Sequence, residues 1–358
     1  MAKARSLATT IATVSALLFA VSAACADDPD RQARDRDRQT LLNWTAGWNI
    51  LVWPAGSTLT GCFFLGERAH RQSIADAAHD WSTSANIRFD FGHAPGYRDC
   101  DGERASVLRI GFRMSLASQS HTGTLALDAA TNRPNVFIGI GGVATRPIQE
   151  IREAALHEIG HFLGLPHEHQ HPASPCPAEF KIQAVCERQD VFATYSDRER
   201  TEMLEMMQGQ VRLRRNPANS PHPAYDAASI MHYRFPAGLL SAGTASACHT
   251  FAARTLSDGD RAKSQERYPA DPAAQRDFLR AQALTIAEAI GASGRDAASA
   301  HRIARLAETY VARVYPDLDF VVRLDPAHLA AAAARQNETA SAAPAIGAEA
   351  AQCQPRAP

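Results

Sequence analysis

Residues 157–168 read HEIGHFLGLPHE, and this stretch decides the expected fold. In a helix, His157 and His161 lie one turn apart on the same face, so both imidazoles can bind one metal ion. Glu158 lies beside them and can reach a water molecule on that metal. Gly164 tolerates the positive φ of a sharp chain reversal, which would bring His167 back as a third ligand. Three protein ligands leave one tetrahedral position open for water, as in catalytic zinc sites.

A second motif lies downstream, where residues 229–233 read SIMHY. Together the two stretches resemble the metzincin zinc peptidases, which combine the extended histidine motif with a methionine-containing turn beneath the metal. Glu168, directly after the third histidine, and the Met-His-Tyr order make the chain most similar to the astacin-like branch. The resemblance covers roughly residues 48–269, and the extended histidine motif is its most specific part.

The resemblance implies an α+β fold of the metzincin type, with a twisted mixed sheet, a backing helix, an active-site helix and a Met-turn. It implies one catalytic Zn²⁺ with three metal ligands, His157, His161 and His167. Glu158 would act as general base and then general acid. Met231 would form the hydrophobic floor below the histidines.

Two further residues take expected roles from the resemblance. Tyr233 matches the tyrosine that reaches the zinc or hydrogen-bonds the oxyanion. Glu168 matches a glutamate that pairs with the amino terminus of the mature chain in this family. We expect the neighbouring His169 and His171 to be surface residues, and His232 to be structural.

The apolar periodicity along the chain predicts the elements of such a domain. Strands are expected at 58–65, 87–91, 107–112, 125–127 and 135–140. Helices are expected at 68–83, from a cap at Thr145 with Pro147 in the first turn to about 163, and at 196–208 and 257–268. Substrate is expected to add antiparallel to an edge strand at 118–127, with the Gly123 region nearest the zinc.

The two ends of the chain lie outside the catalytic domain, which we place at residues 48–270. Residues 1–26 have the positive start, apolar core and Ala-Cys-Ala site of a signal peptide. A membrane anchor or an acylated Cys25 are the alternatives. Residues 27–39 are charged and lack apolar periodicity, and residues 27–47 are expected to form a flexible leader or a short pro-segment. Residues 271–329 predict a helical C-terminal extension that the chemistry does not need, and 330–358 an alanine-rich tail of low complexity.

The chain contains seven cysteines, and removal of the signal peptide would leave six. An even number in an exported chain predicts up to three disulfides. Cys176 and Cys186 bracket one short loop and are the favoured pair, and Cys353 could bind Cys248 or another chain. We expect a secreted or periplasmic protein. Only three of the 37 basic residues are lysines, Lys3, Lys181 and Lys263, which favours a bacterial source rich in GC codons.

The expected function is that of a secreted zinc-dependent endopeptidase acting on protein or peptide substrates. The net charge of -1 gives no reason to expect a nucleic-acid partner. No stable membrane insertion is expected after signal cleavage, and a monomer is the default. The alternative from another class is a zinc-binding recognition or adhesion module with the same fold and no turnover. A hydrolase of non-peptide amides is a third option.

Overall fold

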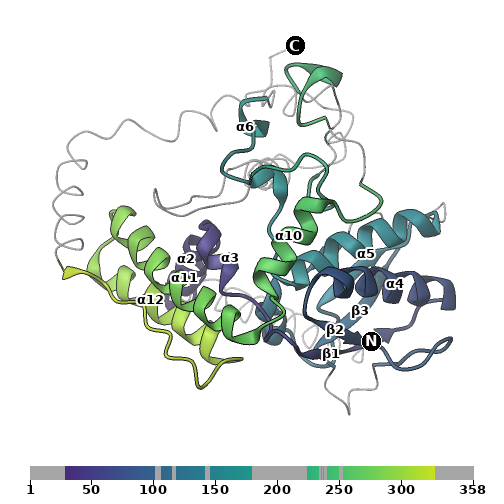
Figure 1. The fold of residues 1–358 in the computed structure, drawn as a ribbon, viewed down its shortest axis with the longest axis horizontal. Helices are drawn as coiled ribbons and strands as arrows, with labels where there is room; N and C mark the ends of the chain where they lie inside the picture. The colour runs from purple at the N-terminus through teal and green to yellow at the C-terminus, as the bar shows by residue number, and fades with distance from the viewer. Residues whose placement is uncertain are drawn as a thin grey trace, which may run out of the picture.

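A mixed five-stranded sheet forms one layer of the molecule (Figure 1). The computed structural model describes residues 29–100, 106–114, 118–141, 146–179, 224–233, 235, 237, 240–249 and 253–326. The strands are β1 (Thr58–Phe64), β2 (Arg88–Asp90), β3 (Leu108–Arg113), β4 (Gln119–Ser120) and β5 (Val136–Gly139). Their order is β2-β1-β3-β5-β4, with β4 antiparallel to β5 at one edge and the other pairs parallel.

Two long helices pack against each other and against the sheet (Figure 1). They are α4 (Arg68–Ser84) and α5 (Ile148–Phe162). Apolar residues at helical spacing bury one face of α4, among them Ile74 and Trp81, both 0% exposed. The indole nitrogen of Trp81 donates a hydrogen bond to the carbonyl oxygen of Leu156 in α5. The expected backing helix and active-site helix are therefore both present, and their packing fixes α5 relative to the sheet.

The shorter elements lie around this body. They are α3 (Thr45–Asn49), η1 (Gly123–Asp128), η2 (Glu168–Gln170), α6 (Cys176–Glu179), η4 (Gly243–Ala245) and α10 (Asp258–Arg267). α10 starts with a capping box, in which the hydroxyl of Ser257 accepts a hydrogen bond from the amide of Asp260 while the Asp260 carboxylate accepts one from the amide of Ser257. This helix was expected at 257–268, and its position is confirmed.

Two local expectations were wrong. Residues 125–127 are not a strand, because Gly123 adopts a φ of +47° and the chain enters the 3₁₀ helix η1. The edge strand in the region 118–127 is therefore reduced to β4. The helix α5 begins at Ile148, with Pro147 as its N-cap residue instead of in the first turn. Thr145, the expected cap, and the helix expected at 196–208 lie outside the described residues.

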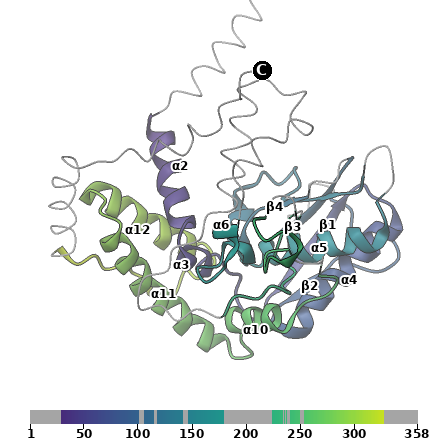
Figure 2. The same ribbon diagram turned by 90° about the horizontal axis from the view of Figure 1, so that it is seen from above.

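The two ends of the described chain meet in a helical layer (Figure 2). It contains α2 (Pro29–Leu42), α11 (Pro272–Ala292) and α12 (Ala297–Ala312). The helical extension expected after residue 271 is confirmed as helical, but the flexible leader is corrected to a helix. α2 packs against α12, where Arg302 binds the buried carboxylate of Asp37 at 2.7 Å. The partner of Asp37 lies 265 residues later in the chain, so a local pattern does not reveal this contact.

The extension shares its hydrophobic core with the rest of the protein. Leu279 and Ile286 of α11 belong to the same buried cluster as Ile110 of the sheet and Ile159 of α5. Whether residues 27–47 are a pro-segment, and where the domain boundary near residue 270 lies, stay predictions. The signal peptide and the tail at 330–358 fall outside the described residues.

Two disulfides join distant segments, Cys62 to Cys100 and Cys176 to Cys248. The expected pairing of Cys176 with Cys186 is wrong, because Cys176 is already bonded to Cys248, and Cys353 cannot bind Cys248 for the same reason. Sequence proximity favoured the short loop, whereas the tertiary fold brings the two sulfurs together across 72 residues. Cys186 and Cys353 lie outside the described residues. Within the described part of the chain, no helix is both long and apolar enough to cross a membrane.

Candidate metal centre

The helix α5 carries His157, Glu158 and His161 in its last two turns. Gly160, on the same helix, faces the methionine of the second motif. A β-carbon at this glycine would lie 2.4 Å from the sulfur of Met231, closer than real side-chain contacts allow. Glycine at this position therefore lets Met231, 1% exposed, pack directly beneath the helix.

A sharp reversal follows the helix at Gly164, where φ is +86°. A β-carbon there would lie 3.0 Å from the carbonyl oxygen of Leu51, so both the backbone angle and the space favour glycine. The amide of Leu165 donates back to the carbonyl oxygen of Gly160 at 2.9 Å, which closes the turn. The reversal places His167 opposite the two helical histidines.

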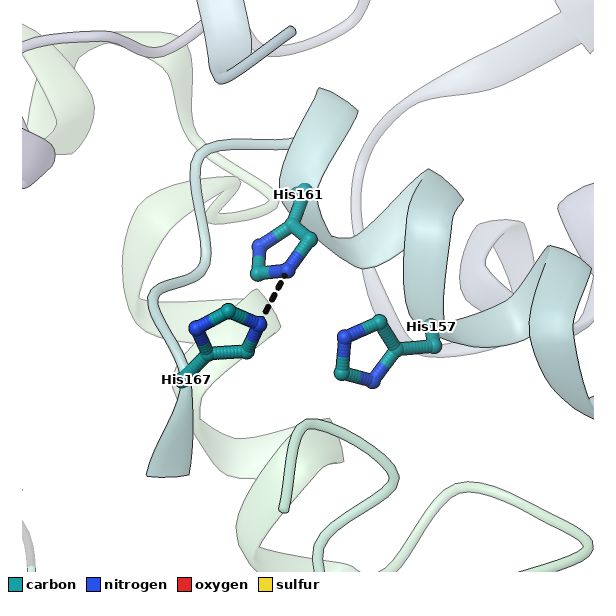
Figure 3. A group of neighbouring side chains, drawn as sticks. All are labelled: His157, His161 and His167. Atoms are coloured by element: carbon teal, nitrogen blue, oxygen red, sulfur yellow. Dashed lines mark hydrogen bonds between the residues drawn. The ribbon is translucent and has the colours of Figure 1, made fainter. Parts of the chain in front are cut away.

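The three imidazoles converge on one point (Figure 3). Their candidate ligand atoms all lie within 4.8 Å of one another. The Nε2 atoms of His161 and His167 are 3.0 Å apart. The Nδ1 atom of His157 lies 2.8 Å from the carbonyl oxygen of Ile230, and that of His161 lies 2.8 Å from the carbonyl oxygen of Leu165.

These hydrogen bonds set the tautomers of His157 and His161. A carbonyl oxygen can only accept, so each Nδ1 donates and each Nε2 keeps its lone pair for the centre. Desolvation by the surrounding protein also lowers the pKa of His157, which favours its neutral form. Imidazole nitrogens that converge at this spacing fit a bound cation, and three imidazoles suit zinc.

Glu158 supplies an acid or base at the same centre. The residue is 6% exposed, and its Oε2 atom has no hydrogen-bond partner among the described residues. Burial raises the pKa of Glu158 to about 8, against the opposing effect of the positive charge of Arg113. A buried carboxylate with one unpaired oxygen is costly unless a ligand uses it. Its position beside the histidines therefore fits a group that exchanges protons with a reacting molecule.

Tyr233 stands against the histidine cluster. Its ring centroid lies 4.1 Å from that of His167 and 5.6 Å from that of His157. Burial raises the pKa of Tyr233 to about 12, and the nearby carboxylate of Glu158 adds to this effect. The phenol thus keeps its proton at neutral pH and can donate a hydrogen bond.

His169 lies on the other side of this tyrosine, contrary to the sequence-based expectation of a surface residue. It is 0% exposed, and its ring stacks on Tyr233 with centroids 4.6 Å apart. The amide of Tyr233 donates to Nδ1 of His169 at 3.4 Å. The sequence around His169 did not reveal this contact, because Tyr233 lies far away in the chain. His171 is half-buried.

Glu168 has a partner that the sequence did not reveal. The resemblance implied that Glu168 pairs with the amino terminus. In this structure, Oε2 of Glu168 binds the ammonium group of Lys263 from α10 at 2.5 Å. Its Oε1 accepts from the amide of Asp226 at 2.8 Å. The two residues are 95 positions apart, so no local pattern pointed to this pair. The Met-turn is held by the same helix, because Asp260 accepts hydrogen bonds from the Ser229 hydroxyl and, at 2.8 Å, from the Ile230 amide.

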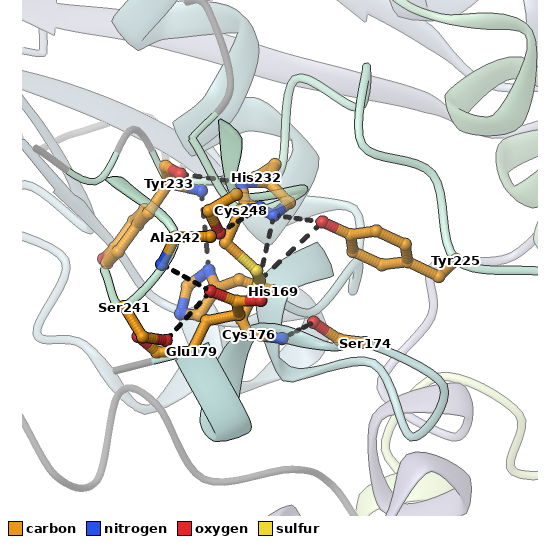
Figure 4. Close-up of a disulfide and its surroundings, with 11 residues drawn as sticks. His169, Ser174, Cys176, Glu179, Tyr225, His232, Tyr233, Ser241, Ala242 and Cys248 are labelled. Atoms are coloured by element: carbon orange, nitrogen blue, oxygen red, sulfur yellow. Dashed lines mark hydrogen bonds between the residues drawn. A yellow bond between two sulfur atoms is a disulfide. The ribbon is translucent and has the colours of Figure 1, made fainter. Parts of the chain in front are cut away.

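A second cluster of potential ligands lies behind the Met-turn (Figure 4). It combines Cys176, His232 and Cys248. The two sulfurs are joined in a disulfide, so they do not offer thiolates to a metal. His232 accepts or donates a hydrogen bond at 2.7 Å with the hydroxyl of Tyr225 and lies 2.6 Å from the carbonyl oxygen of Tyr233. This cluster fastens the chain on either side of the Met-turn.

No protein-family model matches the chain, and no curated protein matches it. Among solved structures, it is similar to two structures of myroilysin, each at 25% sequence identity. They cover 62% and 61% of this chain, and 96% and 86% of theirs, with TM-scores of 0.48 and 0.42. It is also similar to high choriolytic enzyme 1, a hatching-enzyme zinc protease of the medaka Oryzias latipes, at 16% identity. That match covers 59% of this chain and 88% of the other, with a TM-score of 0.36. Since all these TM-scores lie below 0.5, the functional assignment depends on the chain's own side chains.

Proposed function

We propose that this protein is a secreted zinc-dependent endopeptidase. The observation that carries the proposal is the buried Oε2 of Glu158, which has no hydrogen-bond partner in the described part of the chain and lies beside three convergent histidines. A binding module would need the three ligands but would gain nothing from a buried carboxylate without a partner. The two disulfides suit the oxidising compartment of an exported protein.

In this proposal His157, His161 and His167 hold the zinc ion. When bound there, zinc would act as a Lewis acid. It would lower the pKa of a water molecule, so that the water becomes a nucleophile at neutral pH, and it would polarise the substrate carbonyl. Glu158 accepts a proton from the attacking water and passes it to the departing amine. Tyr233 donates a hydrogen bond to the oxyanion of the substrate, because its phenol stays protonated.

The substrate would lie extended along β4, the edge strand of the sheet. The side of β4 that faces away from β5 has no strand partner among the described residues. Backbone groups on such an edge can pair with a peptide in β conformation. This geometry favours a protein or peptide substrate over a small amide, which would leave the edge unused.

The test compares Glu158→Gln with the matched variant Glu150→Gln on the same helix. Glu150 has a 54% exposed side chain and lies at the far end of α5. Glu158→Gln should keep one zinc ion per chain and lose cleavage of a denatured protein by several orders of magnitude, since the amide cannot accept the proton. Glu150→Gln should cleave normally, and a chelator should abolish that cleavage. An active Glu158→Gln enzyme would refute the role of Glu158 as the proton acceptor. A wild-type protein that binds zinc but cleaves nothing would favour the recognition module.

A further inference from the structure

Lys263 forms a buried ion pair directly behind the third candidate ligand. The side chains of Lys263 and Glu168 are 9% and 5% exposed, and Glu168 follows His167 in the chain. The second carboxylate oxygen of Glu168 accepts a hydrogen bond from the amide of Asp226. Both oxygens are thus used, and the position of Glu168 is set by groups outside its own loop.

The choice of lysine at this position is unusual for this chain. Only three of its 37 basic residues are lysines, so arginine carries nearly all the positive charge. A guanidinium is planar and needs several acceptors in one plane, whereas an ammonium is a compact point charge. The ammonium group of the buried Lys263 donates to one carboxylate oxygen, Oε2 of Glu168. Lysine therefore suits the contact with Glu168, although arginine supplies most of the positive charge in this chain.

The same face of α10 also holds the Met-turn. Asp260, three residues before Lys263 and 0% exposed, accepts the amide hydrogen of Ile230. The carbonyl oxygen of Ile230 in turn faces Nδ1 of His157 at 2.8 Å. The two loops are joined directly, because the amide of Glu168 donates to the carbonyl oxygen of Met231 at 3.0 Å. One helix face thus supports the loops behind two of the three candidate ligands.

We propose that Lys263 is a positioning residue of the metal centre, and that its ion pair with Glu168 sets the place of His167. This inference rests on the proposed zinc site, but not on peptide hydrolysis. Without the ammonium group, the buried carboxylate of Glu168 would lose the counter-charge that it contacts, which is strongly unfavourable. The loop would shift to hydrate the carboxylate and would carry His167 away from the centre. The amino terminus of the chain is not needed for this pairing, since Lys263 supplies the charge from within.

The experiment measures the zinc dissociation constant by competition with a chelator in full-length protein. Lys263→Met removes the charge and keeps the length of the side chain, and it should weaken zinc binding about 10- to 100-fold, as loss of partners behind metal ligands does. Arg280→Met is the control, because its ion pair with Asp277 on α11 is exposed, and it should bind zinc normally. The double variant Glu168→Gln/Lys263→Met removes both charges and keeps an acceptor for the Asp226 amide. It should recover zinc affinity to within about threefold of the wild type.

Two results would overturn the proposal. One is a Lys263→Met protein that binds zinc as tightly as the wild type. The other is a double variant that folds, by circular dichroism, yet binds zinc no better than Lys263→Met, because the uncompensated charge of Glu168 would then not be what displaces His167. If Lys263→Met does not fold, the double variant decides by itself, since it carries no unpaired charge. A wild-type protein that binds zinc without cleaving peptides would refute the proposed function and leave this inference standing.

Discussion

Gln275 connects the C-terminal extension to the segment behind the metal centre, and its replacement by leucine tests whether the extension is part of the catalytic unit. The residue is 1% exposed. Its Oε1 accepts from the amide of Ala55 and the hydroxyl of Tyr315, at 2.6 and 2.5 Å. Its Nε2 donates to the carbonyl oxygens of Trp53 and Arg267, at 3.0 and 2.6 Å.

The loss in the free energy of unfolding depends on which hydrogen-bond partners of Gln275 have no other partner. In Gln275→Leu, the Tyr315 hydroxyl still donates to the carbonyl oxygen of Trp53 at 3.1 Å, so these two groups stay paired. The Ala55 amide and the Arg267 carbonyl have no other partner among the described residues. Each unsatisfied buried group costs about 1–3 kcal/mol, and the apolar leucine returns part of this. We expect a loss of about 3 kcal/mol in the free energy of unfolding.

Urea unfolding of the zinc-loaded protein measures this loss, with Gln72→Leu as the control. Gln72 is exposed on α4, so its replacement should change stability by less than about 0.5 kcal/mol. The loss should reach the metal centre, because Trp53 stacks on Phe162 and donates its indole hydrogen to the Phe162 carbonyl oxygen. A loss below about 1 kcal/mol for Gln275→Leu would refute the reasoning. The extension would then be an appendage, as the sequence led us to expect.

Three further predictions concern the centre itself. His167→Ala should lose most of its zinc on dialysis, because two ligands on one helix bind weakly; full occupancy measured by metal analysis would require another third ligand. Tyr233→Phe should lower kcat about 100-fold while zinc content and KM change little, since its phenol is proposed to act on the oxyanion; an unchanged kcat would make the tyrosine structural. In zinc-free protein, the raised pKa of Glu158 means that its carboxylate destabilises the fold increasingly as pH rises from 4.5 to about 8. Glu158→Gln should therefore be more stable than the wild type at pH 8 and similar near pH 4, by pH-dependent urea unfolding, and equal stability at both pH values would contradict the burial argument.

The sequence predicted the parts of this protein that obey local rules. The spacing of His157 and His161 requires only a helix, and the helix is there. Strand β1 and helix α4 show the expected apolar patterns and end within a residue of the expected positions. The reversal at Gly164 follows from the freedom of glycine at positive φ. Each of these features depends on residues close together in the chain.

The features that the sequence did not reveal depend on distant partners. Lys263 and Glu168 are 95 residues apart, and nothing in either neighbourhood marks them as a pair. Cys176 was assigned to the nearest cysteine, although the fold brings Cys248 to it. His169 looked like a surface histidine because its burial comes from the Met-turn, more than 60 residues later. Local patterns therefore specify the elements, while long-range polar contacts specify the geometry of the centre.

Replacements of Glu158 and of Lys263 should affect the centre in different ways, one through turnover and the other through zinc binding. Glu158→Gln leaves every contact of the three histidines in place, so it should keep zinc and lose turnover. Lys263 is proposed to contact neither the substrate nor the metal. At saturating zinc, Lys263→Met should therefore recover most of the wild-type kcat, whereas the zinc concentration needed for half-maximal activity should rise about 10- to 100-fold. Titration of peptide cleavage against free zinc measures both quantities in one assay. If saturating zinc fails to restore kcat in Lys263→Met, the ion pair must position more than the metal, and Tyr233 on the linked Met-turn would be the residue displaced.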